Sequence, residues 1–136
     1  MKALIKNYKV TIGACCVGYV CQAIVNNFAP LLFVTFGTQF GISLAETTVL
    51  ITVNFAIQLT VDLLSAKLID RIGYRAAGVS AHLFIGVGLI LMGTLPYAVS
   101  SPLAGLIAAS AVYSVGGGML EVMVSPLVES CPTKGK

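Results

Sequence analysis

The sequence predicts an all-α membrane protein with four transmembrane helices, and three observations lead to this fold class. Of its 136 residues, 57% are hydrophobic and only 10% are charged, and the mean hydropathy is +0.97. These values lie far outside the range of an ordinary soluble domain. Four apolar stretches reach the roughly 20 helical residues needed to cross a hydrocarbon core about 30 Å thick. A transmembrane barrel is excluded, because the sequence has no series of alternating ten-residue segments.

The predicted spans cover residues 10–36, 44–68, 76–95 and 103–128, in one transmembrane domain over residues 1–136. Lys2 and Lys6 precede the first span as in a secretory signal. That span is longer than a signal's apolar region and shows no small-residue cleavage site, so we expect it to stay in place as a signal anchor. The cysteines are expected to be reduced thiols, and neither a zinc site nor a cofactor is expected.

Helix-start and turn signals support the remaining spans. Ser43 and Glu46 have the spacing of a capping box, in which each side chain satisfies a backbone donor at a helix start. This pair predicts the beginning of the second span at the outer surface. Pro96 and Pro102 bracket a very short turn, so the third and fourth spans are predicted to be antiparallel neighbours.

The basic residues predict the orientation. All eight lie on one side of the proposed topology: Lys2, Lys6, Lys9, Lys67, Arg71, Arg75, Lys134 and Lys136. The loops at residues 37–43 and 96–102 have none. By the positive-inside rule, both termini and the central loop lie in the cytoplasm and the chain crosses the cell (inner) membrane. So few, scattered cations point to a lipid bilayer as partner and not to nucleic acid.

Polar residues inside the spans are the candidate binding residues. Asn54, Gln58 and Asp62 follow an i, i+4, i+8 spacing, which places them along one stripe of the second span. A charged side chain at the bilayer centre costs roughly 2.5–3.5 kcal/mol on insertion scales. Intramembrane carboxylates therefore mark solute or proton pathways. Asp62 is explained equally by such a role and by a structural ion pair with nearby cations.

The fourth span has a comparable stripe of small and polar residues, formed by Ser110, Ser114, Gly117 or Gly118, Glu121 and Ser125. Glu121 is predicted to bind a proton or a solute. Ser114, like the amides of the second span, is interpreted first as a residue that hydrogen-bonds between helices, with a binding role as the alternative. His82 is interpreted as a packing residue, with proton relay as its alternative role.

The central residues 66–75 resemble the G-x-L-a-D-R-x-G-R-[RK] motif between helices two and three of the major facilitator superfamily. The matching positions are Asp70, Arg71, Gly73 and Arg75, whereas Ala66 and Tyr74 replace a glycine and an arginine of the motif. An acid at a helix end, next to basic residues on a tight glycine turn, suits an ionic latch at an inner gate.

A second resemblance is to the branch that includes fucose permease and related sugar–proton symporters. It is carried by the positions Gly116, Leu120, Glu121 and Pro126 in the fourth span. The pair Asn26 and Asn27 resembles the paired asparagines in helix one of those proteins. The acid that follows the pair there is absent here, where residues 28–30 are Phe, Ala and Pro.

These resemblances imply the first part of an N-terminal six-helix half, and hence a truncated twelve-span transporter. The implied function is proton-coupled movement of a small polar solute such as a sugar, by alternating access. The residues expected to bind solute or protons are Asn26, Asn27, Gln58, Asp62, Ser114 and Glu121. The implied partners are the solute, protons and the missing remainder of the transporter or another subunit.

Two other functions are weighed against this one. A four-helix exporter acting as a homodimer carries its essential acid in the middle of the first span, where this sequence has none. A non-transporting tetraspan scaffold would fill the polar stripes with partner side chains. An enzyme is not expected, because the sequence has no Ser-His-Asp set and no metal cluster, and residues 116–118 lack the Lys-Ser/Thr of a phosphate-binding loop.

Overall fold

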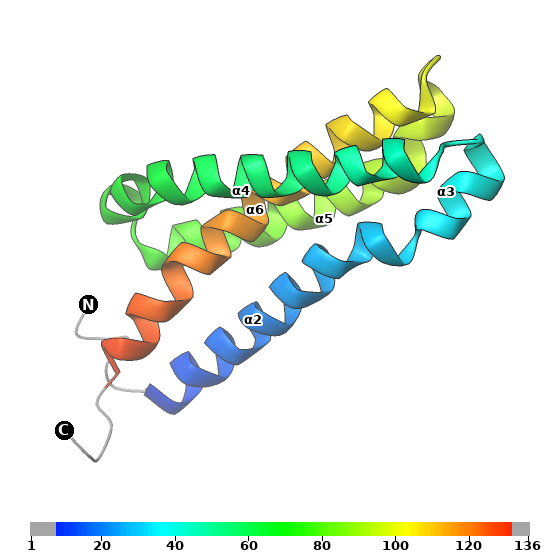
Figure 1. Cartoon of the computed structure of the whole chain (residues 1–136). Helices are drawn as coiled ribbons and strands as arrows, with labels where there is room; N and C mark the ends of the chain where they lie inside the picture. Colours follow the sequence, from blue (N-terminus) through cyan, green and yellow to red (C-terminus); the bar gives the residue numbers. More distant parts are fainter. Residues whose placement is uncertain (1–7, 132–136) are drawn as a thin grey trace.

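The computed structural model describes residues 8–131, which form helices and no strand. The first crossing consists of α2 (Tyr8–Leu31) and the short α3 (Phe33–Phe40), and it is followed by α4 (Leu44–Ile72), α5 (Tyr74–Ala98) and α6 (Pro102–Glu129) (Figure 1). Four stretches are long and apolar enough to cross a membrane: Tyr8–Phe40, Leu44–Ser65, Tyr74–Ala98 and Pro102–Glu129. The predicted all-α fold, with four helices long and apolar enough to cross a membrane, is confirmed for the described residues.

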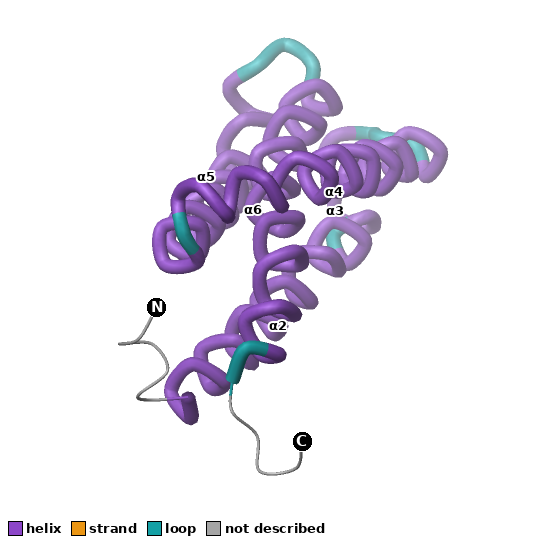
Figure 2. The backbone as a smooth tube through the Cα atoms, turned by 90° about the vertical axis from the view of Figure 1, so that its left-hand side faces the viewer, coloured by secondary structure: helices purple, strands orange, loops and turns teal. Residues whose placement is uncertain are grey.

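Helix α6 lies at the centre of the bundle. It packs against α5, α4 and α2, whereas α2 and α4 contact each other only slightly. Figure 1 shows α2 lying apart from α4 and α5, and in Figure 2 the C-terminal part of α6 reaches α2. Of the apolar window of α6, 61% is buried, compared with 22% for the first crossing. A helix that is apolar on all sides and buried on most of them is the core element of such a fold.

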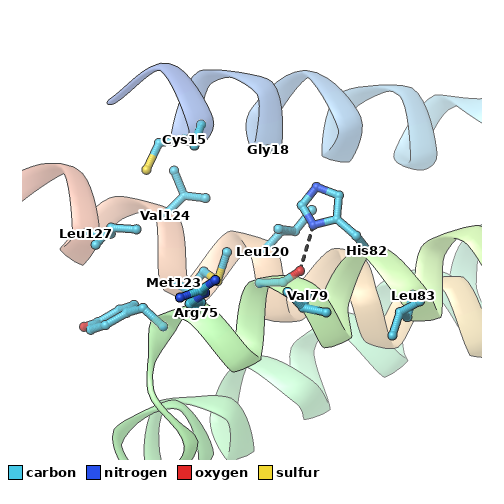
Figure 3. A pocket seen from close by; sticks show the side chains of 13 residues that line it. Cys15, Gly18, Arg75, Val79, His82, Leu83, Leu120, Met123, Val124 and Leu127 are labelled. Atoms are coloured by element: carbon cyan, nitrogen blue, oxygen red, sulfur yellow. Dashed lines mark hydrogen bonds between the residues drawn. The ribbon is translucent and has the colours of Figure 1, made fainter. Parts of the chain in front are cut away.

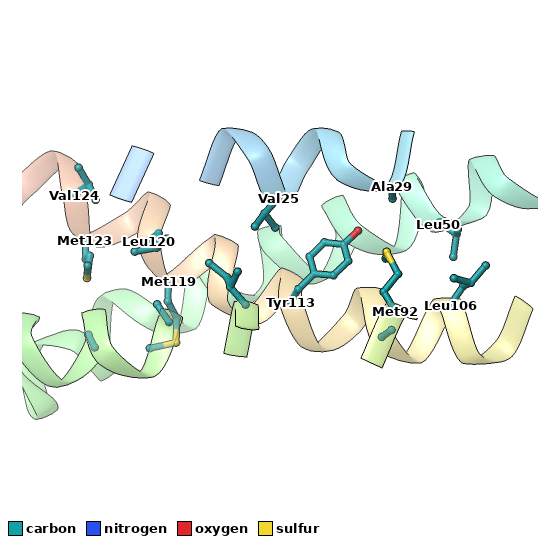
Figure 4. Close-up of a cluster of buried hydrophobic side chains, with 14 of the residues drawn as sticks. Val25, Ala29, Leu50, Met92, Leu106, Tyr113, Met119, Leu120, Met123 and Val124 are labelled. Carbon is teal, nitrogen blue, oxygen red and sulfur yellow. The ribbon is translucent and has the colours of Figure 1, made fainter. Parts of the chain in front are cut away.

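The closest helix contact joins α5 and α6. A Cβ atom placed on Gly88 would lie 2.5 Å from the backbone nitrogen of Tyr113, so only glycine fits there. Gly116 is similarly close to the backbone carbonyl of Ala81. Small residues let helix backbones approach in lipid, where van der Waals packing replaces the hydrophobic effect as the main attraction. The Tyr113 ring, only 1% exposed, points into the buried cluster beside Met92 (Figure 4).

The first crossing differs from the predicted single helix over residues 10–36, because it is interrupted at Leu32. Pro30 has no backbone N–H, so the carbonyl of Asn26 loses its usual helical partner. The Leu32 nitrogen instead donates to the Ala29 oxygen at 3.0 Å, three residues back. Helix α3 then continues the path as far as Gly41, whose φ of +66° ends it in the left-handed conformation.

The C-terminal end of α3 is attached to the C-terminal end of α5. The Tyr97 hydroxyl donates to Gln39 Oε1 at 2.9 Å, and the rings of Phe40 and Tyr97 meet edge to face with centroids 5.1 Å apart. Edge-to-face pairs of this kind contribute about 0.5–1.5 kcal/mol beyond the area they bury. The α3 part of the first crossing is therefore held to the bundle at its C-terminal end.

The helix-start signals read from the sequence are present. The backbone nitrogen of Glu46 donates to Ser43 Oγ at 3.3 Å, and the Ser43 nitrogen donates to Glu46 Oε2 at 2.8 Å. This reciprocal pair is the predicted capping box. Helix α6 begins with Pro102 after Ser101, whose Oγ accepts from the Ala104 nitrogen. Proline suits this first helical position because its missing N–H has no helical acceptor there.

The connection between the second and third spans is shorter than expected. Helix α4 continues to Ile72 and α5 begins at Tyr74, so Gly73 alone joins them. Its φ of +82° and ψ of +153° belong to a region that is essentially restricted to glycine. The predicted loop over residues 66–75 is therefore almost entirely helical, because a helix need not stop where its apolar stretch leaves the bilayer.

Candidate functional site

Polar side chains from three helices meet one another inside the bundle. We call this group the polar cluster, and its members are Gln22, Asn26, Asn54, Gln58, Asp62, Ser114 and Glu121. Most of them are joined in pairs that link different helices. Such bonds satisfy groups that the hydrocarbon core could not hydrate.

One pair joins α2 to α4 and another joins α4 to α6. Gln58 Nε2 donates to Asn26 Oδ1 at 2.9 Å, although α2 and α4 otherwise contact each other little. Ser114 Oγ donates to Asn54 Oδ1. Gln58 and Asn54 are 4% and 3% exposed and Ser114 is fully buried. The i, i+4 stripe predicted on the second span therefore faces its neighbours and not the lipid.

Between α2 and α6, Gln22 Nε2 donates to Glu121 Oε2 at 2.8 Å. Nearby, the hydroxyls of Tyr19 and Ser125 are 2.8 Å apart at an exposed position. Glu121 is itself partly open, on the side of α6 that the other helices leave uncovered. A carboxylate that is held by one amide and reachable from outside can exchange a proton or a solute hydroxyl without unfolding of the bundle.

The carboxylate of Asp62 is the least satisfied member of the polar cluster. Its Oδ1 is buried and has no hydrogen-bond partner within residues 8–131. It lies against α6, because a Cβ on Gly118 would be 3.2 Å from this oxygen. Glu121 is one helical turn further along α6 and within coulombic range of Asp62. A buried carboxylate oxygen of Asp62 and the exposed carboxylate of Glu121 thus lie near each other within apolar helices, a feature of functional positions in membranes.

Gln22 was missed by the sequence analysis. The resemblance drew attention to Asn26 and Asn27, while Gln22 lies one helical turn before Asn26 and hence on the same face. The four-residue spacing between Gln22 and Asn26 is the sequence signal that could have identified Gln22. Asn27 lies outside the polar cluster: it is exposed, and its Nδ2 donates to the Ala23 oxygen of its own helix at 2.8 Å.

The residues proposed for an inner gate lie together at the end of α4 and the start of α5. Asp70 and Arg71 occupy the last turn of α4, and Arg75 follows Gly73 in the first turn of α5, all with exposed side chains. Asp70 also borders a small pocket of about 130 Å³ beside Tyr74. An ionic latch formed by these residues stays a prediction.

Metal and disulfide chemistry have no visible site in residues 8–131. No group of three or more His, Cys, Asp or Glu side chains there could hold a metal ion. The cysteines are unpaired: Cys15 is buried, Cys16 is exposed, and Cys21 and Cys131 are half-buried. His82, predicted as a packing residue, lies outside the polar cluster and is exposed on α5.

A scan against protein-family models found no match, and searches of the curated proteins and of the solved structures found none either. The structure thus defines a class by its own features, a membrane protein with four apolar helices and an internal polar cluster.

Proposed function

We propose that this chain forms part of a secondary active transporter that moves a small polar solute, such as a sugar, together with protons. The observation that supports this most is the polar cluster, in which α2, α4 and α6 all contribute side chains at mid-helix. Amide and hydroxyl groups of this kind bind polar solutes by paired donors and acceptors. The resemblance to the major facilitator superfamily agrees with this proposal. It also implies that the chain belongs to an N-terminal six-helix half.

In this proposal Glu121 exchanges the coupling proton, because it is reachable and is held by a single amide donor. Asn26 and Gln58 hold the solute by hydrogen bonds, and Asp62 adds a second carboxylate beside Glu121. Asp70, Arg71 and Arg75 hold an inner gate on the cytoplasmic side, where the positive-inside rule places both termini. Alternating access then needs the remaining spans of the transporter, or another subunit, as the opposing wall.

Transport measurements with Glu121→Gln test this proposal. The natural gene product that contains this chain is reconstituted in proteoliposomes, and uptake of labelled monosaccharides is followed with and without an inward proton gradient. We expect Glu121→Gln to abolish gradient-driven uptake, while Glu129→Gln, the same change at an exposed position of α6, leaves it intact. Unchanged proton-driven uptake by Glu121→Gln would refute the assigned role.

A non-transporting scaffold is the second candidate, and a specific observation favours it. The pairs Gln58–Asn26, Ser114–Asn54 and Gln22–Glu121 are closed within the chain. A water-soluble thiol reagent separates the two functions in a variant that lacks the native cysteines. Labelling of Asn26→Cys and Ser125→Cys, but not of Ile90→Cys on the exposed face of α5, supports a water-filled pathway. Protection of all positions supports the scaffold.

A further inference from the structure

A groove separates α2 from α5, and α6 forms its floor (Figure 3). Its volume is about 580 Å³. The walls carry Ala14 and Gly18 from α2 and Val79 and Leu83 from α5, and the floor includes Leu120 and Val124. None of the lining residues belongs to the polar cluster, so the groove is a separate feature of the molecule.

The groove is apolar along its length and carries a cation at one end. Arg75 lines that end, in the first turn of α5. His82 follows seven residues later, about 10 Å further along the helix, but its Nδ1 is 2.7 Å from the Gly78 oxygen and donates to its own helix. The His82 ring therefore forms part of the α5 wall of the groove. A ligand that fits this pattern has one anionic end and a long apolar body.

We propose that the groove binds an anionic phospholipid, with the phosphate on the Arg75 guanidinium and one acyl chain over the floor formed by α6. A guanidinium matches phosphate oxygens with two parallel N–H donors. Arg71 and Lys67, exposed at the same end of the bundle, attract anionic headgroups to this surface. The exposed side chains of Val79 and Leu83 give the acyl chain access from the bilayer.

The volume of the groove favours a chain over a helix as its occupant. A helix is about 10–12 Å across and a spanning one about 30 Å long, which corresponds to roughly 2,000–3,000 Å³. That is several times the volume of the groove. The proposal needs only the groove and the Arg75 guanidinium, which the proposed inner gate also uses, and it is tested without a transport assay.

Native mass spectrometry of the full chain in detergent tests the proposal. The probes are dioleoyl phosphatidylglycerol and dioleoyl phosphatidylcholine, which share their acyl chains and differ in net charge. We expect one phosphatidylglycerol to be retained in preference to phosphatidylcholine. Arg75→Gln should weaken that binding about 30-fold, the effect of losing a hydrogen bond to a charged group. Arg71→Gln, outside the groove, should weaken it by no more than about fivefold, the effect of surface charge.

A second set of variants fills the groove with a larger side chain. Ala14 is exposed on α2, so Ala14→Phe should leave the thermal unfolding temperature unchanged and lower retention of both lipids. If that variant fails to fold, Val79→Phe on the opposite wall replaces it. An equal effect of Arg71→Gln and Arg75→Gln would overturn the proposal. Two other outcomes would also overturn it. One is that Ala14→Phe retains as much lipid as the unchanged protein and that inorganic phosphate alone displaces this lipid. The other is that the protein forms a dimer that Ala14→Phe dissociates.

Discussion

The fourth and the first crossings are both apolar, but they are held in the molecule by different means. Helix α6 is fixed by close backbone contacts at Gly88 and Gly116, and 61% of its apolar window is buried. Helix α2 exposes Val17 and Val20 at 59% each and places only a narrow stripe, including Val25 and Ala29, in the core. Polar pairs such as Gln22–Glu121 add to this limited packing. Van der Waals packing is rigid, whereas a few hydrogen bonds can be exchanged for bonds to water or solute.

This contrast assigns different roles to the two helices in the proposed transporter. The α5–α6 pair is the frame that positions Ser114 and Glu121. Helix α2 is the element whose polar contacts can open, with its outer half attached through Tyr97.

Replacing Gly88 by leucine should separate α5 from α6. A Cβ at this position would meet the Tyr113 backbone at 2.5 Å, which neither helix can relieve by a rotamer change. We expect destabilisation of about 3 kcal/mol or more, measured by thermal unfolding in detergent. Gly86→Leu is the matched control, since a Cβ on Gly86 has nothing within 4 Å. Equal effects of the two variants would contradict the close packing.

Asp62→Asn should stabilise the chain by about 1 kcal/mol or more, because an unsatisfied buried group costs more when it is charged than when it is a neutral amide. The substitution removes a charge whose Oδ1 is buried and unpaired, next to Glu121. Asp70→Asn, at an exposed position, is expected to change stability by less than about 0.5 kcal/mol. Denaturant titration at neutral pH measures both. A loss of stability in Asp62→Asn would show that the carboxylate has a structural role.

Gln22→Leu should cost about 0.6–1.7 kcal/mol, the range measured for hydrogen bonds between membrane helices. It removes the donor to Glu121 Oε2 and loosens α2 from α6. A double-mutant cycle with Glu121→Gln isolates the pair. A coupling energy near zero would indicate that α2 is held by packing, which would remove the contrast between the two crossings.

Tyr19→Phe should have the smallest effect, about 0.5 kcal/mol or less. The hydroxyl is 2.8 Å from Ser125 Oγ, but the contact is exposed and solvent can replace it. The expected readout is an unchanged unfolding temperature with a broader distance distribution between spin labels on α2 and α6. A narrower distribution would contradict a loosely held α2.

The sequence predicted the number of crossings and the Ser43 cap, because both depend on local composition and spacing. It did not predict the interruption at Leu32, since hydropathy measures apolarity and not hydrogen bonding, although Pro30 was a visible cause. Asn26 and Asn27 are adjacent residues of the same type, so the sequence alone does not show which of them faces the bundle. The rotation of α2 about its axis decides this. That rotation depends on contacts with α6, which are tertiary and leave no local pattern.

Gly73 is the whole connection between α4 and α5. With one residue between them, the end of α4 and the start of α5 cannot move far apart, so Asp70 and Arg75 stay near the same joint. Inserted glycines would leave both helices intact and allow these two side chains to separate. The length of this connection in sequence thus also limits how far the second and third spans can separate at this end of the bundle.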